Sequence, residues 1–418
     1  MDKHRPALAD DSSNGREAAD GGAPPAKLRR PLSVAVVLTL VALNLRPALS
    51  SLGPVLPEVM RVTGISAGAA SILVAVPVLC LGLFGFPAPR IARRFGTERT
   101  IFGMLLMLAA GIVLRGVPSF PGLLAGTVIA GAAIGIIGVL LPGLVKRDFP
   151  ESASLMTGVY TMALCTGAAG AAAATVPLQH ALGAGPLAAL AFWAVPAAIA
   201  AAAWISLLPR RTGRTVRAIT KIGGLWRDPL AWQVTFYMGL QSSLAYIVFG
   251  WLAPILRDRG VDPVLAGFLV SGSVLVQAVA GLTAPILAAR RRNQSAWAAA
   301  MMGLTLAGLL GCLYAPLGML WLWVVVLGLG QGGAFAIALM LIVLRSTDAH
   351  VAAQLSGMSQ SVGYTLASTG PLAVGLLHDW TGGWGAIGWL FVAVCGTAAL
   401  FGLAAGRALQ VRVVSRPA

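Results

Sequence analysis

The sequence predicts an all-α membrane protein whose twelve transmembrane helices form two six-helix pseudo-repeats. Hydrophobic residues make up 57% of the 418 residues and charged residues only 11%, whereas about a quarter of the residues in soluble domains are charged. Apolar stretches recur along the chain that are long enough to cross about 30 Å of hydrocarbon. The two halves also share matching residues at a nearly constant offset, which is typical of an internal repeat.

Each long apolar stretch is expected to be a helix, because lipid offers no partner for exposed backbone polar groups. Six stretches lie in the first half, at 32–57, 66–89, 100–117, 121–145, 152–178 and 184–208. Six more lie in the second half, at 229–256, 263–289, 295–315, 317–344, 351–377 and 385–406. Pro and Gly residues inside these stretches are expected to produce kinks.

Polar segments divide the chain into five predicted parts. Residues 1–31, rich in Asp, Ala, Gly and Pro, are predicted to be a disordered cytoplasmic tail. The first apolar run starts too late and is too long for a secretory signal, so it is expected to stay as an anchor. The other parts are an N-terminal six-helix bundle (32–208), a cytoplasmic linker (209–228), a C-terminal six-helix bundle (229–406) and a cytoplasmic tail (407–418).

The distribution of basic residues predicts the orientation in the membrane. Both tails and alternate loops hold 25 of the 30 Lys and Arg residues. Because cytoplasmic loops carry an excess of Lys and Arg, both termini of this multi-pass protein are predicted to lie on the cytoplasmic side of a bacterial inner membrane. The same placement explains the net charge of +16 without a nucleic-acid partner.

One motif identifies the repeat most clearly. The segment 63–66 (Thr-Gly-Ile-Ser) matches the segment 259–262 (Arg-Gly-Val-Asp) at an offset of 196. Similar offsets of 198 and 199 relate Gly135 to Gly333 and Gly158 to Gly357. Two repeats of this kind place a substrate site near the membrane midplane between them.

Arg46 is the most informative single residue, because it lies about fourteen residues into the first apolar stretch, near the bilayer middle. A charge there costs roughly 2.5–3.5 kcal/mol on insertion scales. None of the 14 acidic residues lies in the middle of an apolar stretch, and only Glu58 comes close. We therefore interpret Arg46 as a charge that a mobile anionic or electron-rich substrate neutralises. The alternative is an arginine bound by helix carbonyls or by Glu58. Pro47 is expected to kink or open the helix beside it.

The other candidate substrate-binding residues are polar side chains within the apolar stretches. They are Asn44, Tyr160, Tyr237, Gln241, Gln331, Gln360 and Tyr364. Two pairs among them stand four residues apart, on one helix face. Within hydrocarbon these groups need partners in a wet cavity or across a helix interface, so helix packing is the alternative role for each.

Other residue patterns argue against catalytic chemistry. The four cysteines lie in separate apolar stretches without metal-ligand spacing, and we interpret them as core residues. No Lys stands in a phosphate-binding loop, so no ATP motor is predicted. We therefore predict no catalytic residue, no metal site and no cofactor. Arg115, beside Pro118, is expected to reach the lipid headgroups.

Several strings resemble the cyanate and 2-nitroimidazole permease family of the major facilitator superfamily. They are Asn44-Leu45-Arg46-Pro47, the basic segment 89–96, the glycine-rich segment 329–333 and the segment 355–364. The resemblance implies the major facilitator fold and secondary transport by alternating access. It also implies a cavity lined by the first, fourth, seventh and tenth helices, where Arg46, Gln241 and Gln331 converge. One departure is Arg93, which stands where the loop motif of the superfamily has Asp, so the usual account of gating is not carried over.

The sequence thus favours a monomeric secondary active transporter, embedded in the lipid bilayer, that moves a small anionic or polar heterocyclic solute. A drug or toxic-compound exporter of the same superfamily is the alternative, and it would be expected to have an aromatic cavity with an acidic residue. A membrane-embedded lipid-modifying enzyme is a remote alternative. Such an enzyme needs a cluster of Asp, Glu or His residues, and the sequence contains none.

Overall fold

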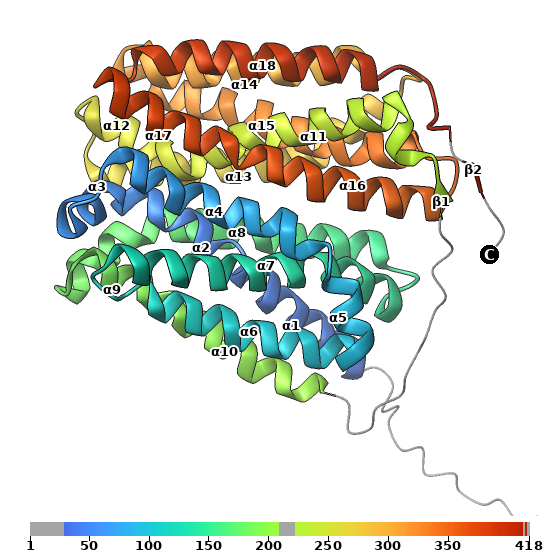
Figure 1. The fold of residues 1–418 in the computed structure, drawn as a ribbon, viewed down its shortest axis with the longest axis horizontal. Helices are drawn as coiled ribbons and strands as arrows, with labels where there is room; N and C mark the ends of the chain where they lie inside the picture. Colours follow the sequence, from blue (N-terminus) through green and yellow to red (C-terminus); the bar gives the residue numbers. More distant parts are fainter. Residues whose placement is uncertain (1–28, 209–221, 413, 416–418) are drawn as a thin grey trace, which may run out of the picture.

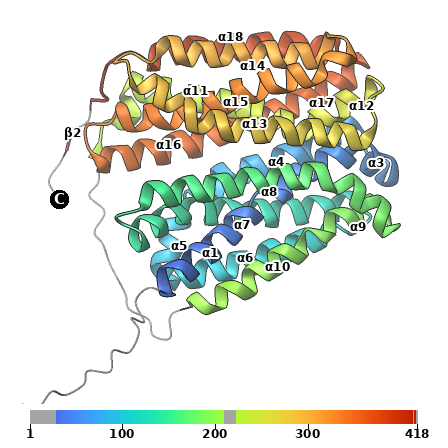
Figure 2. The same cartoon turned by 180° about the vertical axis from the view of Figure 1, so that it is seen from behind.

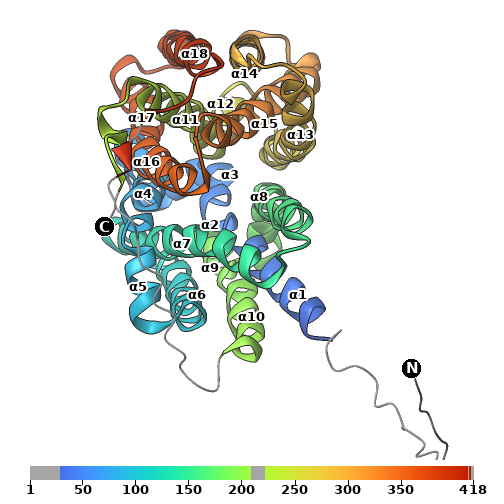
Figure 3. The ribbon, with the colours of Figure 1, turned by 90° about the vertical axis from the view of Figure 1, so that its right-hand side faces the viewer.

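The computed structural model describes residues 29–208, 222–412 and 414–415. Nearly all of the predicted N-terminal tail and most of the predicted linker therefore lie outside the described residues. The helices form two bundles, one from each half of the chain, which lie one above the other in Figure 1 and, from behind, in Figure 2. Figure 3 shows the same two groups with many helices nearly end-on. The predicted all-α architecture of two bundles is confirmed.

The first bundle contains the first six predicted spans. The first span is split into α1 (Arg29–Asn44), α2 (Pro47–Ser50) and α3 (Leu52–Thr63). The next four are α4 (Ala67–Gly85), α6 (Thr97–Leu114), α7 (Phe120–Asp148) and α8 (Ala153–Leu182), with the short α5 (Ala88–Phe95) joining α4 to α6. The sixth span is split into α9 (Gly185–Phe192) and α10 (Ala194–Trp204), followed by η1 (Ile205–Leu207).

The second bundle contains the other six. Its first span is α11 (Pro229–Ile247), continued by a π-helical turn, η3 (Val248–Leu252), and by α12 (Ala253–Asp258). The next three are α13 (Pro263–Ala289), α14 (Ser295–Tyr314) and α15 (Leu320–Leu344), with η4 (Leu317–Met319) before α15. The last two are α16 (Ala349–Ala367) with α17 (Thr369–Thr381), and α18 (Gly385–Ala405).

Eleven helical segments of the described chain are long and apolar enough to cross a membrane. The remaining predicted span, 351–377, is interrupted at Ser368 between α16 and α17. These two helices pack on α11 of their own bundle and on α4 of the other bundle. Contact with protein on both sides explains why this span is more polar than the others.

The repeated motif forms the same turn in both bundles. Gly64 (φ 68°) follows α3 and Gly260 (φ 90°) lies just after α12, both in the left-handed region that favours glycine. Two residues later, the side chains of Ser66 and Asp262 accept backbone N–H groups from the first turn of the next helix. The sequence repeat is therefore a structural repeat.

The predicted linker and the C-terminal tail contact each other. The short strand β1 (Ile222–Gly223) pairs antiparallel with β2 (Val414–Ser415), and η2 (Leu225–Arg227) leads into α11. One oxygen of Asp228 caps α11, and the other accepts the backbone N–H of Arg412 at 2.8 Å. The described end of the chain is thus held against the start of the second bundle.

A few helices carry the contacts between the two bundles. Helix α8 packs on α13, and α4 packs on α16 and α17. Helix α3 packs on η3, α12 and α13. We call the end of the molecule that contains α3, α9 and α12 the α3 end, and the opposite end, which contains α5, the α5 end (Figure 1).

Candidate functional site

The first span is interrupted at the predicted position. Helix α1 ends at Asn44 and α2 starts at Pro47, with a turn between them. Pro47 has no N–H to donate to the carbonyl of Leu43, four residues earlier. Gly167 of α8 packs directly on this carbonyl, because a Cβ atom at Gly167 would lie only 1.9 Å from the oxygen. The break beside Arg46 therefore forms as predicted, and α8 packs closely against it.

The Arg46 side chain lies among aromatic rings of the second bundle. Its Cζ atom is 6.0 Å from the ring centroid of Tyr246 and 6.0 Å from that of Phe249, a distance at which a cation and a ring attract each other. The Tyr246 side chain lies next to the guanidinium. Within the described part of the chain, no carboxylate forms a salt bridge with Arg46. Aromatic side chains of the second bundle are thus the neighbours of this charge.

Side chains from three other spans lie around the guanidinium. Tyr364 of α16 meets Tyr246 edge-to-face, with ring centroids 6.1 Å apart. Tyr364 and the Cys165 thiol of α8 also lie near Arg46, and Tyr160 of α8 lies near Tyr364. We call this group the central site; its members are Arg46, Tyr160, Cys165, Tyr246, Phe249 and Tyr364. Both bundles contribute to it, so a rearrangement of one bundle against the other changes the site.

Three of the eight predicted site residues meet in the central site; they are Arg46, Tyr160 and Tyr364. Gln360 lies one turn before Tyr364, and its amide donates to the Ser356 hydroxyl at 2.8 Å. Asn44 lies two residues before Arg46, but its amide donates to a carbonyl of its own helix at 2.8 Å. These two residues lie next to the central site, but their amide groups donate hydrogen bonds within their own helices.

The other three predicted residues are engaged inside the second bundle. The Gln241 amide bonds within its own turn of α11, and Gln331 of α15 accepts from a glutamine of α13 at 3.1 Å. Tyr237 is fully buried, and its hydroxyl donates to a backbone carbonyl of α14 at 3.4 Å. In the described residues no interaction connects any of them to Arg46, so the expected convergence of Arg46 with Gln241 and Gln331 is not observed.

Three central-site residues are not predicted from the sequence, for different reasons. The repeat offset of 196 carries Arg46 onto Ser242, and Tyr246 lies one turn further, so the repeat could have indicated this tyrosine. Phe249 lies in the π-helical turn, which shifts the face that the following residues present and has no sequence signature. Cys165 is interpreted from the sequence as a core residue, yet it lies near enough to interact with Arg46.

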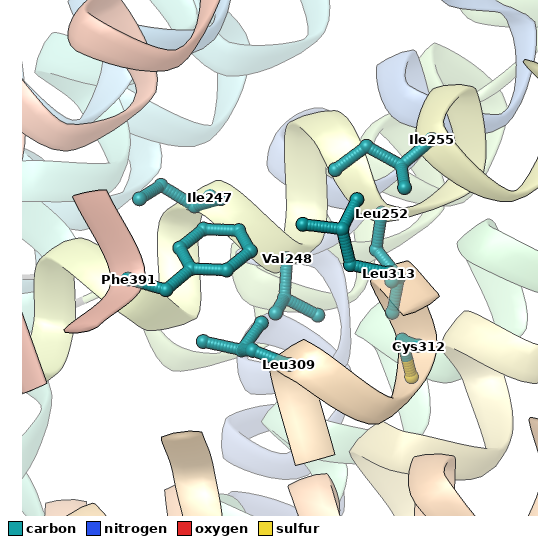
Figure 4. A pocket seen from close by; sticks show the side chains of 8 residues that line it. All are labelled: Ile247, Val248, Leu252, Ile255, Leu309, Cys312, Leu313 and Phe391. Atoms are coloured by element: carbon teal, nitrogen blue, oxygen red, sulfur yellow. The ribbon is translucent and has the colours of Figure 1, made fainter. Parts of the chain in front are cut away.

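A small apolar pocket lies within the second bundle, beside η3 (Figure 4). It is lined by Ile247, Val248, Leu252, Ile255, Leu309, Cys312, Leu313 and Phe391. None of these side chains is charged, and only the cysteine has a weakly polar group. The pocket therefore offers no specific partner to a charged or hydrogen-bonding solute. The central site is the better candidate for binding.

The junction between the bundles is closed at the α3 end. Arg257 of α12 donates to both oxygens of the Glu58 carboxylate of α3, at 2.7 Å for Nη1 to Oε2. Burial raises the pKa of Glu58, but the hydrogen bonds and charge of Arg257 outweigh it, so the pKa lies below its usual value. Asp379 of α17 makes a second link by accepting the Gly68 N–H of α4 at 2.6 Å. Because Glu58 binds Arg257, it is not the partner of Arg46.

The expectation that Arg115 reaches the lipid headgroups is wrong. Its residue exposure is 2%, and its Nη1 atom donates to the Ala48 carbonyl of α2 at 2.8 Å. The interruption of the first span explains the difference, because it leaves a carbonyl inside the bundle that the guanidinium can reach.

These features define a class of protein: a membrane transporter with two six-helix bundles and a central site shared between them. The sequence profile of the Major Facilitator Superfamily matches residues 35–371. The chain belongs to this superfamily.

Two known transporters are similar to this chain over most of its length. The chain is 36% identical to the 2-nitroimidazole transporter of Escherichia coli K12 over 387 aligned residues. The aligned region covers 90% of this chain and 95% of that protein. The chain is 30% identical over 363 residues to the cyanate transport protein CynX of the same organism, with 86% and 93% covered. The solved structure of the nucleoside transporter NupG superposes with a TM-score of 0.72 at 13% identity, over 89% of this chain and 99% of that one, which shows the fold alone. The predicted resemblance is confirmed, and the family and relatives are transporters rather than enzymes.

Proposed function

We propose that this protein is a secondary transporter that moves a small anionic or electron-rich polar solute by alternating access, with Arg46 as its central charge. The observation that carries the proposal is the placement of Arg46. Its guanidinium lies at the junction of the bundles, and its neighbours are three tyrosine or phenylalanine rings of the second bundle. No carboxylate of the described chain pairs with it.

The charge of Arg46 favours an anionic or electron-rich partner. A buried cation needs a countercharge or strong acceptors, and a substrate that supplies them gains charge-assisted hydrogen bonds. The flat faces of Tyr246, Phe249 and Tyr364 favour a compact, planar solute. Cyanate and 2-nitroimidazole, the compounds in the names of the two relatives, are both small and rich in acceptor atoms. An exporter of cationic drugs is disfavoured, because an acidic residue at the central site would be needed.

The arrangement of the bundles supports alternating access. The central site draws on both bundles, and the contacts of Glu58 and Asp379 close the α3 end. Separation of the bundles at one end with closure at the other would expose the site to each side of the membrane in turn. We further propose that one chain suffices, since its own two bundles form the site. Light scattering that reports a stable dimer in detergent would contradict this last proposal.

The excess of basic residues at the α5 end supports an orientation with that end in the cytoplasm and the chain in a bacterial inner membrane. Arg292 is exposed at the α5 end and Gly318 at the α3 end. In a Cys165→Ser background, a membrane-impermeant maleimide added to intact cells should label Gly318→Cys and not Arg292→Cys. The reverse labelling pattern would overturn the orientation.

Ligand-dependent protection of Cys165 tests the proposed function. Thermal-shift measurements on the purified protein would first screen a panel of cyanate, 2-nitroimidazole and benzoate for stabilisation. N-ethylmaleimide should then react mainly at Cys165, because Cys80, Cys312 and Cys395 are buried. A stabilising compound at ten times its dissociation constant should slow this labelling about tenfold, since about a tenth of the sites remain free.

The control for this experiment is Cys165→Ser, which should remove most of the labelling. A compound that stabilises the protein but leaves the Cys165 labelling rate unchanged binds elsewhere, and that result would count against the central site.

A further inference from the structure

Arg115 is a buried cation without a countercharge in the described part of the chain. It is 2% exposed, its Nη1 atom donates to the Ala48 carbonyl at 2.8 Å, and its Nε atom has no hydrogen-bond partner among the described residues. Burying a guanidinium with a donor left unpaired is costly, and apolar residues of similar volume are often at least as stable at such places. Bundle stability alone therefore does not explain this arginine.

The carbonyl that Arg115 binds belongs to a special part of the chain. Ala48 lies in α2, a helix of four residues between the break at residues 45 and 46 and a second interruption at Ser51. Because Ser51 separates α2 from α3, the Ala48 oxygen does not continue the helical ladder, and the guanidinium of Arg115 takes its place as the donor. This hydrogen bond ties α2 to the end of α6.

The position of α2 determines the position of Arg46. Arg46 directly precedes α2, and its carbonyl accepts the backbone N–H groups of Leu49 and Ser50 at 2.9 and 3.1 Å. The backbone of Arg46 is thus part of the same short turn that Arg115 holds. A shift of α2 would carry the Arg46 side chain away from Tyr246.

A glycine of α7 leaves space for the Arg115 side chain. A Cβ atom at Gly126 of α7 would lie 2.9 Å from the Arg115 Cγ atom and 2.5 Å from the carbonyl oxygen of Gly111 in α6. Close packing of α6 on α7 through these glycines therefore sets where the arginine stem runs. The guanidinium therefore reaches α2 from a part of the first bundle where two helices pack closely.

We propose that Arg115 is a positioning residue of the central site, which holds α2, and through it Arg46, against the second bundle. This inference rests on the proposed function, since it assigns Arg115 to the geometry of the substrate site. Arg115 itself does not touch the substrate; it acts through a backbone carbonyl of the turn that carries Arg46.

The test compares Arg115 with a matched arginine far from the central site. Arg345 is also buried, at 4% exposure, and it also donates to backbone carbonyls, those of Ala405 and Gly406 at the α5 end. Uptake of cyanate, 2-nitroimidazole and benzoate into proteoliposomes would be measured for Arg115→Met, Arg115→Lys and Arg345→Met. Thermal unfolding without ligand would report the stability of each variant.

The expected result is a change in KM that is specific to Arg115. Arg115→Met should raise KM about tenfold or more, the scale of a lost charged hydrogen bond, whereas Arg345→Met should change KM by less than about twofold. Arg115→Lys keeps a charged donor that can reach the carbonyl, so its KM should be close to that of the parent. If Arg115→Met does not fold, Arg115→Gln carries the same comparison.

Equal KM values for the Arg115 and Arg345 variants would overturn the inference, even if both proteins are less stable. The proposed function fails in a different way. If Arg46→Ala transports with an unchanged KM, the central site itself is wrong, whereas an impaired Arg46→Ala with equal Arg115 and Arg345 variants refutes only the role of Arg115.

Discussion

Replacing Arg46 with alanine is expected to lower the uptake of a transported panel compound by about thirtyfold or more. The physical reason is that removing one partner of a buried, hydrogen-bonded charge pair costs about 2–5 kcal/mol. The Phe249 ring has no donor, and the single neutral hydroxyl of Tyr246 cannot replace the charge and the several N–H donors of a guanidinium. Initial uptake rates in proteoliposomes loaded with equal amounts of each variant measure the effect.

Two further variants separate charge from structure. Arg46→Lys keeps the charge but loses the planar fork of donors, so we expect partial activity. Arg99→Ala removes an exposed arginine of the first bundle at the α5 end, and it should transport like the parent. Full activity in both Arg46 variants would mean that the charge is structural, and the anionic-substrate proposal would fail.

The second large effect is expected at the α3 end. Glu58→Gln removes the charge that holds Arg257, and the two side chains are only 14% and 13% exposed. Charged hydrogen bonds of this kind are worth about 1.5–3 kcal/mol. The equilibrium between closed and open α3 ends should therefore shift at least about tenfold toward the open state.

Spin labels on the two bundles measure this shift. Val62 and Leu317 are exposed at the α3 end, one in each bundle, so cysteines there in a Cys165→Ser background report the separation. Glu58→Gln should add a population at longer distance, and the reversed pair Glu58→Arg with Arg257→Glu should restore part of the closed population. Asp258→Asn, next to Arg257 but bonded to Trp384, is the matched control. An unchanged distance distribution in Glu58→Gln would refute the role of this pair in closure.

Acidification should act in the same direction as Glu58→Gln. The pKa of Glu58 is lowered while the α3 end is closed, so the pair favours closure at pH values above the ordinary glutamate pKa of about 4.3. That contribution is lost as the pH falls through the lowered value. The long-distance population should therefore grow below about pH 4 in the parent. In Glu58→Gln, which lacks this carboxylate, the growth that the pair causes should be absent.

Most of the fold follows from the sequence because membrane insertion restricts the choices. Long apolar stretches must be helices, and the predicted spans match helices of the described chain. The repeated glycine turns at Gly64 and Gly260 could be predicted as well, since the residue types and the offset both repeat. The pairing of β1 with β2 could not, because two-residue strands leave no periodic pattern.

Less of the central site follows from the sequence. Arg46 and the break at Pro47 stand out, because a charge and a missing backbone donor are both costly within lipid. Phe249 could not be predicted, since the π-helical turn alters the helix phase. Gln241 and Gln331 have the polarity of site residues, but the Gln241 amide donates within its own turn and the Gln331 oxygen accepts from a glutamine of α13. Helical spacing alone does not distinguish these two roles.

The same limit explains Arg115. Its place beside Pro118, at the end of an apolar stretch, indicates a residue that reaches the headgroups. The buried partner exists only because α2 is interrupted at Ser51 and α6 packs closely on α7. Both features depend on contacts between segments far apart in the sequence, which periodicity does not report.

The structure of the protein with a stabilising panel compound bound tests the central claim most directly. We expect the most negative atom of that compound to lie about 3 Å from a guanidinium nitrogen of Arg46, beside the rings of Tyr246 and Tyr364. A compound bound elsewhere, with the Arg46 guanidinium still held only by aromatic side chains, would contradict the claim that the substrate supplies the countercharge.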